Sequence, residues 1–199
     1  ALGVFKQLLE DEEIGVYIQN AGYEIRVMHK YDVEIENIAC DTMLAAYLID
    51  PNKRRYNLDT LAMEYLQHRT IKYSDVAGSG KKQLRFDEVP VEDAIPYAAE
   101  DADITLQLAE RMLDELDEMN LTELLDDVEV PLARVIAEME DTGIKVDVDF
   151  LQELSEEFDG RLGAIEAKVF EAAGEEFTIN SPKQLSEILF DKLGLPVIK

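Results

Sequence analysis

Tyr97 and Asp101 lie one helical turn apart in the stretch Tyr97-Ala98-Ala99-Glu100-Asp101-Ala102-Asp103. Residues i and i+4 share one face of a helix, so the two side chains are expected to project together. A carboxylate can hold a divalent metal ion, and a phenol beside it can orient a water molecule. These groups are suited to hydrolysis of a phosphodiester. The spacing alone favours an acidic, solvated helix with one buried tyrosine over such a site, because pairs of this kind arise by chance on many acidic helices.

A single carboxylate does not make such a site, because two-metal hydrolysis needs several carboxylates that converge. The segment Gln19-Asn20-Ala21-Gly22-Tyr23-Glu24 is the candidate source of a second acid. It lies where a predicted strand ends and a predicted helix begins, which is the edge at which α/β sheets gather their ligands. Glu24 also fits as an ordinary first-turn acid that the helix dipole favours.

The elements that must position these residues alternate between strand and helix. The predicted strands cover residues 13–20 and 35–40, and the predicted helices cover residues 23–31, 42–49 and 58–66. This alternation predicts an α/β fold with some parallel strands. A further helix is expected to begin near Asp93 as its cap, to carry Pro96 in its first turn, and to end near Leu116.

From residue 119 onward the pattern is purely helical, which predicts a domain boundary near Glu118, with domains at 1–118 and 119–199. One amphipathic helix is expected over residues 130–142, ended by Gly143. A long helix opens at Asp147 or Asp149 and ends at Gly174. In Ser181-Pro182-Lys183-Gln184, serine is the expected N-cap and glutamine the expected partner in a capping box.

Composition and charge limit the classes of function. The chain has 199 residues, 47% of them hydrophobic and 32% charged, with a formal net charge of −25. Such a chain is globular and helix-rich rather than disordered. The negative charge repels nucleic acid, so a role in binding nucleic acid must act through metal ions and local basic sites.

The chain contains one cysteine, Cys40, in an apolar run, and we predict that it is a core residue. A single cysteine excludes an intrachain disulfide and favours a reducing, cytoplasmic location. No apolar segment approaches the length of about 20 residues that spans a membrane, and no signal peptide is visible. Apolar patterns at Ala1 and just before Lys199 are interrupted, so we expect a fragment of a longer protein.

Residues 77–82 form a glycine-rich, basic stretch that contains Lys81 and Lys82. Glycines followed by lysines suggest a phosphate cradle, but the order of residues does not fit the P-loop pattern. A flexible surface loop is therefore the expected structure.

The chain resembles the 3′–5′ proofreading exonuclease domain of bacterial DNA polymerase I, a family A polymerase, followed by the start of the polymerase region. Three stretches carry the resemblance, in matching order and spacing along nearly the whole chain. They are Asp41-Thr42-Met43-Leu44-Ala45-Ala46-Tyr47-Leu48, the Tyr97–Asp103 stretch with Thr105-Leu106-Gln107-Leu108, and Ala173-Gly174-Glu175-Glu176-Phe177 with Ser181-Pro182-Lys183-Gln184-Leu185. The resemblance implies a partial ribonuclease H-like exonuclease fold, then an all-α segment from the base of the polymerase thumb.

The resemblance also implies roles for individual residues. Tyr97 and Asp101 match the family's third motif, in which the tyrosine orients the attacking water and the aspartate ligates metal. Asn20 and Glu24 match the second motif, in which the asparagine helps to hold the site and the acid ligates the second metal. Lys81 and Lys82 fall in a loop expected to approach DNA. The implied cofactor is Mg²⁺ or Mn²⁺, and the implied partners are a single-stranded DNA 3′ end and the remaining polymerase domains of a monomer.

Two departures from the family pattern bear on activity. Glu24 stands where the family has aspartate, and a misplacement of about 1 Å can cost about 100-fold in rate. The family's first motif, an Asp-x-Glu pair on a strand, is expected upstream of Ala1. We therefore expect no meaningful exonuclease activity from this chain alone.

Two readings of the longer protein stay open at this point. Intact Tyr97 and Asp101 favour a polymerase with a working exonuclease site. Glu24 favours an exonuclease-like scaffold that supports the polymerase without catalysis. A stand-alone exonuclease is the least favoured reading, because it leaves residues 119–199 without a role.

Overall fold

The computed structural model describes residues 2–196, and their contacts form two compact units, one that ends at Gly143 and one that begins at Ile144. Ala1 and residues 197–199 lie outside the described part. The expectation that the chain is a fragment is based on the two ends of the sequence, and it stays a prediction. The domain boundary predicted near Glu118 stays a prediction. None of the described helices is both long and apolar enough to cross a membrane.

The first unit combines two strands with helices, as the alternating pattern predicts. Its elements are α1 (Leu2–Leu9), β1 (Val16–Ile18), α2 (Ala21–His29), β2 (Ile38–Asp41), α3 (Thr42–Ile49), α4 (Leu58–Leu61), η1 (Ala62–Leu66), α5 (Tyr73–Ala77), η2 (Gly80–Lys82), η3 (Phe86–Glu88), α6 (Val91–Glu118), α7 (Thr122–Leu124), η4 (Leu125–Glu129) and α8 (Val130–Thr142). Both predicted strands are confirmed, although each is shorter than its apolar run.

The two strands pair in parallel, with Val16 opposite Ile38 and Ile18 opposite Asp41. The register shifts between Val16 and Tyr17, so one strand carries an irregularity there. Because the strands are parallel, both of their carboxyl ends meet at one edge of the sheet, and α2 and α3 both begin there. This edge places the start of α2, with Glu24 in its first turn, next to the end of β2.

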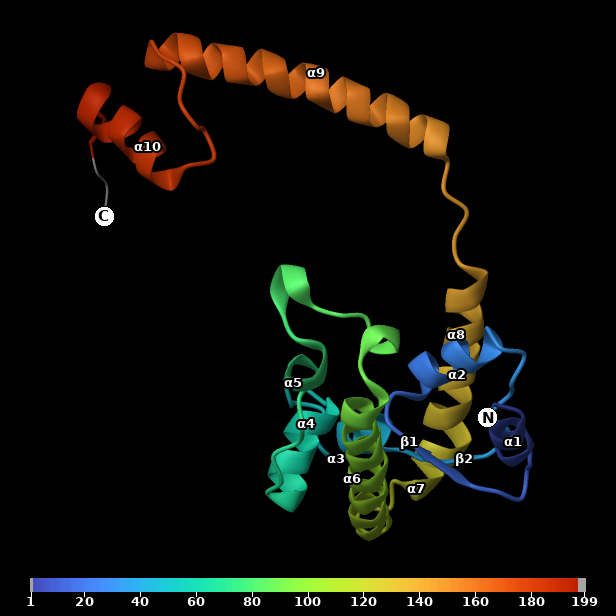
Figure 1. Cartoon of the computed structure of the whole chain (residues 1–199). Coiled ribbons are helices and arrows are strands. Elements are labelled where there is room, and N and C mark those ends of the chain that lie inside the picture. Colours follow the sequence, from blue (N-terminus) through green and yellow to red (C-terminus); the bar gives the residue numbers. More distant parts are fainter. Residues whose placement is uncertain (1, 197–199) are drawn as a thin grey trace. The chain divides into compact units, whose positions relative to one another are not determined.

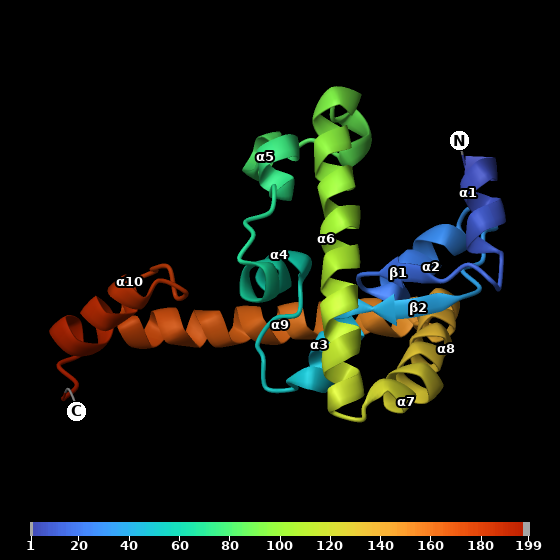
Figure 2. The same cartoon turned by 90° about the horizontal axis from the view of Figure 1, so that it is seen from below.

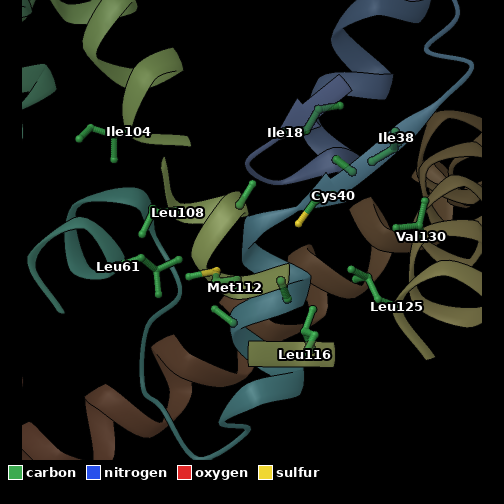
Figure 3. Packing of buried hydrophobic residues seen from close by; sticks show 14 of the residues in the cluster. Ile18, Ile38, Cys40, Leu61, Ile104, Leu108, Met112, Leu116, Leu125 and Val130 are labelled. Atoms are coloured by element: carbon green, nitrogen blue, oxygen red, sulfur yellow. The ribbon is translucent and has the colours of Figure 1, made fainter. Parts of the chain in front are cut away.

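The core is built around one face of α6. Ile104, Leu108, Met112 and Leu116 recur every four residues, so they share a helix face, and all four are buried. α6 packs against α3 and α4, while α8 packs along α2 (Figure 1, Figure 2). Figure 3 shows Leu61 of α4 beside the buried side chains of α6.

Cys40 lies in the core, as predicted, and none of its surface is exposed. Burial raises the pKa of its thiol to about 12, and the neighbouring carboxylates of Asp41 and Asp126 act in the same direction. Because the thiolate is the reactive form of cysteine, burial and the raised pKa both lower the reactivity of Cys40.

The start of α6 differs from the prediction. The helix begins at Val91, directly after Pro90, so Asp93 lies in the first turn and is not the cap. Pro96 consequently lies inside the helix, beyond the first turn. The backbone of Pro90 is extended, with φ −54° and ψ 137°, and this conformation sets the helix start without any side-chain cap.

The second unit contains α9 (Val148–Ala173), α10 (Pro182–Ser186) and η5 (Glu187–Lys192). Asp147 caps α9 by accepting from the backbone N–H of Phe150, and Gly174 ends it with φ 74°. These two ends agree with the prediction, as does the end of α8 at Gly143.

The capping box predicted for α10 is formed only in part. The hydroxyl of Ser181 accepts from the backbone N–H of Gln184 at 3.4 Å. The side chain of Gln184 does not return to the amide of Ser181. It accepts from the backbone N–H of Thr178 at 2.7 Å, because the backbone N–H of Ser181 already donates to the carbonyl of Thr178 at 2.9 Å.

Candidate functional site

Glu24 and Asp101 come from different elements and line one cavity. Glu24 lies in the first turn of α2, and Asp101 lies on α6. The cavity has a volume of about 590 Å³, and its apolar wall includes Val16 and Ile18 of β1 and Leu58 of α4. The structure therefore brings together two acids that are 77 residues apart in the sequence.

Burial shapes the electrostatics of both acids. It raises the pKa of Glu24 above the ordinary value of a glutamate. It also raises the pKa of Asp101, and the negative charges of Glu100 and Asp59 add to this effect, while the hydroxyl of Tyr97 opposes it. Two partly desolvated carboxyl groups at one cavity favour either a bound proton or a bound cation.

Tyr97 is half-buried, one turn before Asp101 on α6. Burial and the charge of Asp101 raise the pKa of Tyr97 to about 12, so its phenol is neutral and keeps its proton near pH 7. Its ring lies 5.8 Å from the ring of Phe86 and 6.4 Å from the ring of Tyr73, measured between centroids. These two contacts restrict the directions in which the Tyr97 hydroxyl can point.

The structure places Asn20 away from the cavity of Glu24 and Asp101. Asn20 adopts the left-handed conformation, with φ 72°, and its side chain makes no capping bond to α2. It lines a second cavity, of about 400 Å³, together with Arg26 and Asp41. Its backbone carbonyl accepts from the N–H groups of Tyr23 and Glu24 and so takes part in the start of α2.

Asp41 organises this edge of the sheet, a role that was not predicted for it from the sequence. Its carboxylate accepts from the backbone N–H groups of Asn20 at 3.0 Å, Ala21 at 2.7 Å and Met43 at 2.8 Å. It thus caps α3 and also fixes the start of α2, which carries Glu24. Burial raises its pKa, although these backbone donors oppose the effect. An aspartate directly before a helix is a recognisable N-cap signal.

Lys81 and Lys82 lie in η2 and are exposed. They do not line the cavity of Glu24 and Asp101. They belong to the segment between α5 and α6 that also carries Phe86, and this ring contacts Tyr97. The segment thus connects the two lysines to the site through the chain rather than by direct contact.

The donor set suits a hard divalent cation in its chemistry, since carboxylate oxygens are the ligands that Mg²⁺ and Mn²⁺ prefer. It is small in number, however. Within residues 2–196 no group of three or more His, Cys, Asp or Glu side chains is arranged to hold a metal ion. Glu24 and Asp101 therefore offer part of a metal site.

Comparison with known proteins extends this description. Residues 1–117 match the family model described as 3′–5′ exonuclease, and residues 148–199 match the model of DNA polymerase family A. The exonuclease match covers the strands, α2 and nearly all of α6, which are the elements that position Glu24, Tyr97 and Asp101.

Curated relatives and a solved structure agree with these matches. The chain is 42% identical to DNA polymerase I of Pseudomonas aeruginosa, over 99% of this chain and 22% of the relative. It is 37% identical to DNA polymerase I of Bacillus subtilis, over 98% of this chain and 22% of the relative. It spans about a fifth of these relatives' length.

The solved structure is described as the POL domain of Pol1 from M. smegmatis in complex with DNA primer-template and dNTP. It aligns with a TM-score of 0.76 and 27% identity, over 100% of this chain and 31% of that chain.

Proposed function

We propose the following function for this chain, which belongs to the 3′–5′ exonuclease family and continues into DNA polymerase family A. It is a segment of a bacterial DNA polymerase I, and its first unit serves the removal of nucleotides from DNA 3′ ends during replication and repair. The observation that carries this proposal is that Glu24 and Asp101 line one cavity, with the neutral phenol of Tyr97 beside Asp101.

Each residue has a distinct role in this proposal. Asp101 and Glu24 hold a divalent ion, Mg²⁺ or Mn²⁺, which when bound lowers the pKa of a water and offsets developing negative charge. Tyr97 keeps its proton and orients the attacking water. Lys81 and Lys82 attract the phosphates of the DNA strand, because they are exposed cations. The rest of the chain is strongly acidic and repels these phosphates.

We also propose that this chain has no measurable exonuclease activity by itself. Two-metal hydrolysis requires several carboxylates around ions about 3.5–4 Å apart. The described residues bring two acids to the cavity, and one of them is a glutamate in the position where the family pattern has aspartate.

Glu24 favours a second function, in which the unit is a scaffold for the polymerase without catalysis of its own. A glutamate is one methylene longer than an aspartate, so its carboxylate cannot occupy the same place relative to α2. A displacement of about 1 Å can lower a rate by about 100-fold. The substitution Glu24→Asp therefore distinguishes an exonuclease site of lowered activity from a scaffold without catalysis.

The test incubates a single-stranded DNA with Mg²⁺ or Mn²⁺ and follows the shortening of this DNA from its 3′ end. The chain alone is expected to give no shortening, and metal-dependent shortening that Asp101→Asn abolishes would contradict this. In the longer polymerase, the exonuclease function predicts shortening that Asp101→Asn lowers by about 100-fold or more and that Glu24→Asp increases. The scaffold function predicts no shortening in any of these variants.

A further inference from the structure

We infer that Glu100 is a positioning residue for Tyr97. Its carboxylate fastens residues 67–72 to α6, and this attachment holds the rings of Tyr73 and Phe86 against Tyr97. The consequence for catalysis rests on the proposed function of Tyr97. The attachment of residues 67–72 to α6 is a structural claim that does not depend on that function.

The carboxylate of Glu100 makes two bonds across the fold. Oε2 accepts from the backbone N–H of Ile71 at 2.6 Å, and Oε1 lies 2.8 Å from Nε2 of His68. The Glu100 side chain is only 18% exposed and the His68 side chain 44% exposed, so the bond to Ile71 is the one partly shielded from water. Hydrogen bonds to a charged acceptor in such surroundings are stronger than bonds between neutral groups.

Glu100 fastens the start of a longer segment, residues 67–90 between η1 and α6, which has little regular structure of its own. This segment contains only the short helices α5, η2 and η3, so its place depends on ties to the rest of the unit. One further tie lies beside Glu100, where the buried Thr70 donates from Oγ1 to Asp59 at 2.7 Å. Residues 68–71 therefore tie the start of the segment to α6 through Glu100 and to α4 through Asp59, directly before Tyr73, and α5 then packs against α6.

The rings that follow this attachment form a cluster with Tyr97. Tyr73 and Phe86 lie 6.1 Å apart, and each also contacts Tyr97. Glu100 is three residues after Tyr97 on α6, so the attachment and the ring it serves share one stretch of helix. If residues 68–71 are released, the two rings lose their fixed place and Tyr97 gains rotational freedom.

Hydrogen exchange and ring chemical shifts measured by NMR test this inference on the whole chain. Glu100→Ala removes both bonds without loss of helix propensity. Glu100→Gln keeps one carbonyl oxygen that can accept from Ile71. Glu110→Ala makes the same change at an exposed position of the same helix. Phe86→Leu removes the ring contacts of Phe86 with Tyr73 and Tyr97 and leaves the attachment in place.

In Glu100→Ala, the amide of Ile71 is expected to exchange about tenfold faster or more. The ring signals of Tyr97 should move toward those of an exposed tyrosine. Glu100→Gln should keep most of the protection at Ile71, and Glu110→Ala should change neither signal. Phe86→Leu should shift the Tyr97 ring signals alone.

Two results would overturn the inference. One is Ile71 exchange and Tyr97 shifts in Glu100→Ala that equal those in Glu110→Ala. The other is equal acceleration of exchange in β1 and α3, which would make Glu100 a general stabiliser of the unit. None of these readouts depends on DNA cleavage. A failure of the proposed function would instead appear as missing 3′-end shortening in the longer polymerase, with the NMR results unaffected.

Discussion

Asp41 illustrates how one buried side chain determines the local geometry of the site. Its carboxylate accepts from backbone N–H groups at the start of two helices, Asn20 and Ala21 at α2 and Met43 at α3. Because α2 carries Glu24, the place of Glu24 depends on a residue that does not line the cavity of Glu24 and Asp101. An asparagine cannot reproduce this pattern, since it replaces one accepting oxygen with a donor.

Asp41→Asn is expected to destabilise the first unit by about 2 kcal/mol or more, because at least one buried N–H loses its charged acceptor. Urea unfolding followed through the amide signals of β1 and α3 measures this change. Asp103→Asn is the control, since Asp103 is exposed and bonds to Gln107 on its own helix. A loss no larger than in this control would show that Asp41 is not the organising residue.

Residue-scale prediction from the sequence succeeded where a residue acts on its own neighbours. The cap Ser181 and the stops Gly143 and Gly174 follow from local backbone needs and lie where expected, and Asp147 is one of the two caps expected for α9. The aromatic neighbours of Tyr97 were not predicted, because Tyr73 and Phe86 reach it only through tertiary packing.

At the scale of elements, the close approach of the two strands depends on a glycine. A Cβ atom at Gly15, just before β1, would lie 2.9 Å from the Cβ of Ala39 in β2, too close for real side chains. Gly22, in the first turn of α2, has no atom within 4 Å of such a Cβ. Alanine substitutions at these two glycines can therefore be compared, because the added methyl group is obstructed at Gly15 and has free space at Gly22.

Gly15→Ala is expected to destabilise the first unit by about 1–3 kcal/mol, because the strands must separate to admit the methyl group. Gly22→Ala should leave stability unchanged or raise it by up to about 1 kcal/mol. Urea unfolding of the two variants compares them directly. Equal effects of the two substitutions would contradict the close packing of β1 on β2.

A charged cluster joins α2 to α8. Arg26 contacts Glu140 at 2.8 Å and Asp141 at 3.0 Å, and His29 lies between Asp141 at 3.0 Å and Glu34 at 3.2 Å. The hydrogen bond to Asp141 is the main cause that raises the pKa of His29. The bonds from His29 and Arg26 lower the pKa of Asp141.

The cluster predicts a dependence of stability on pH. The contribution of the His29 imidazolium is complete below its ordinary pKa of 6.5 and is lost as pH rises through its raised pKa. The contribution of Asp141 is complete above 3.8 and is lost as pH falls through its lowered pKa. The thermal midpoint of the first unit should therefore fall from about pH 6 to about pH 8. His29→Gln should lack this fall, and an unchanged slope in that variant would contradict the prediction.

Element-scale prediction recovered the alternation of strands and helices and the presence of the long helix α6. It did not recover the π-helical turns η1, η4 and η5, because one extra residue per turn is set by packing rather than by local composition. It also placed Asp93 and Pro96 in the wrong part of α6, since the extended backbone of Pro90 ends the preceding segment earlier than the capping pattern suggested.

At the scale of the whole molecule, the net charge of −25 makes it difficult for one site to bind a metal ion more tightly than the rest of the acidic surface. Any divalent cation is attracted to many exposed carboxylates, and surface binding of this kind is weak and screened by salt. The cavity of Glu24 and Asp101 differs because its carboxyl groups are partly desolvated and line the same cavity. The sequence alone could suggest these two acids, but only the parallel pairing of β1 and β2 and the packing of α6 place them together.

The central claim is that Glu24 and Asp101 form one cation site, and Mn²⁺ broadening of NMR signals tests it most directly. At a low ratio of Mn²⁺ to protein and about 0.15 M salt, signals of residues 17–24 and 97–105 should broaden first. Asp101→Asn should remove this selective broadening, while Asp103→Asn should retain it. Broadening that spreads evenly over the acidic surface, or a selective pattern that Asp101→Asn leaves intact, would contradict the claim.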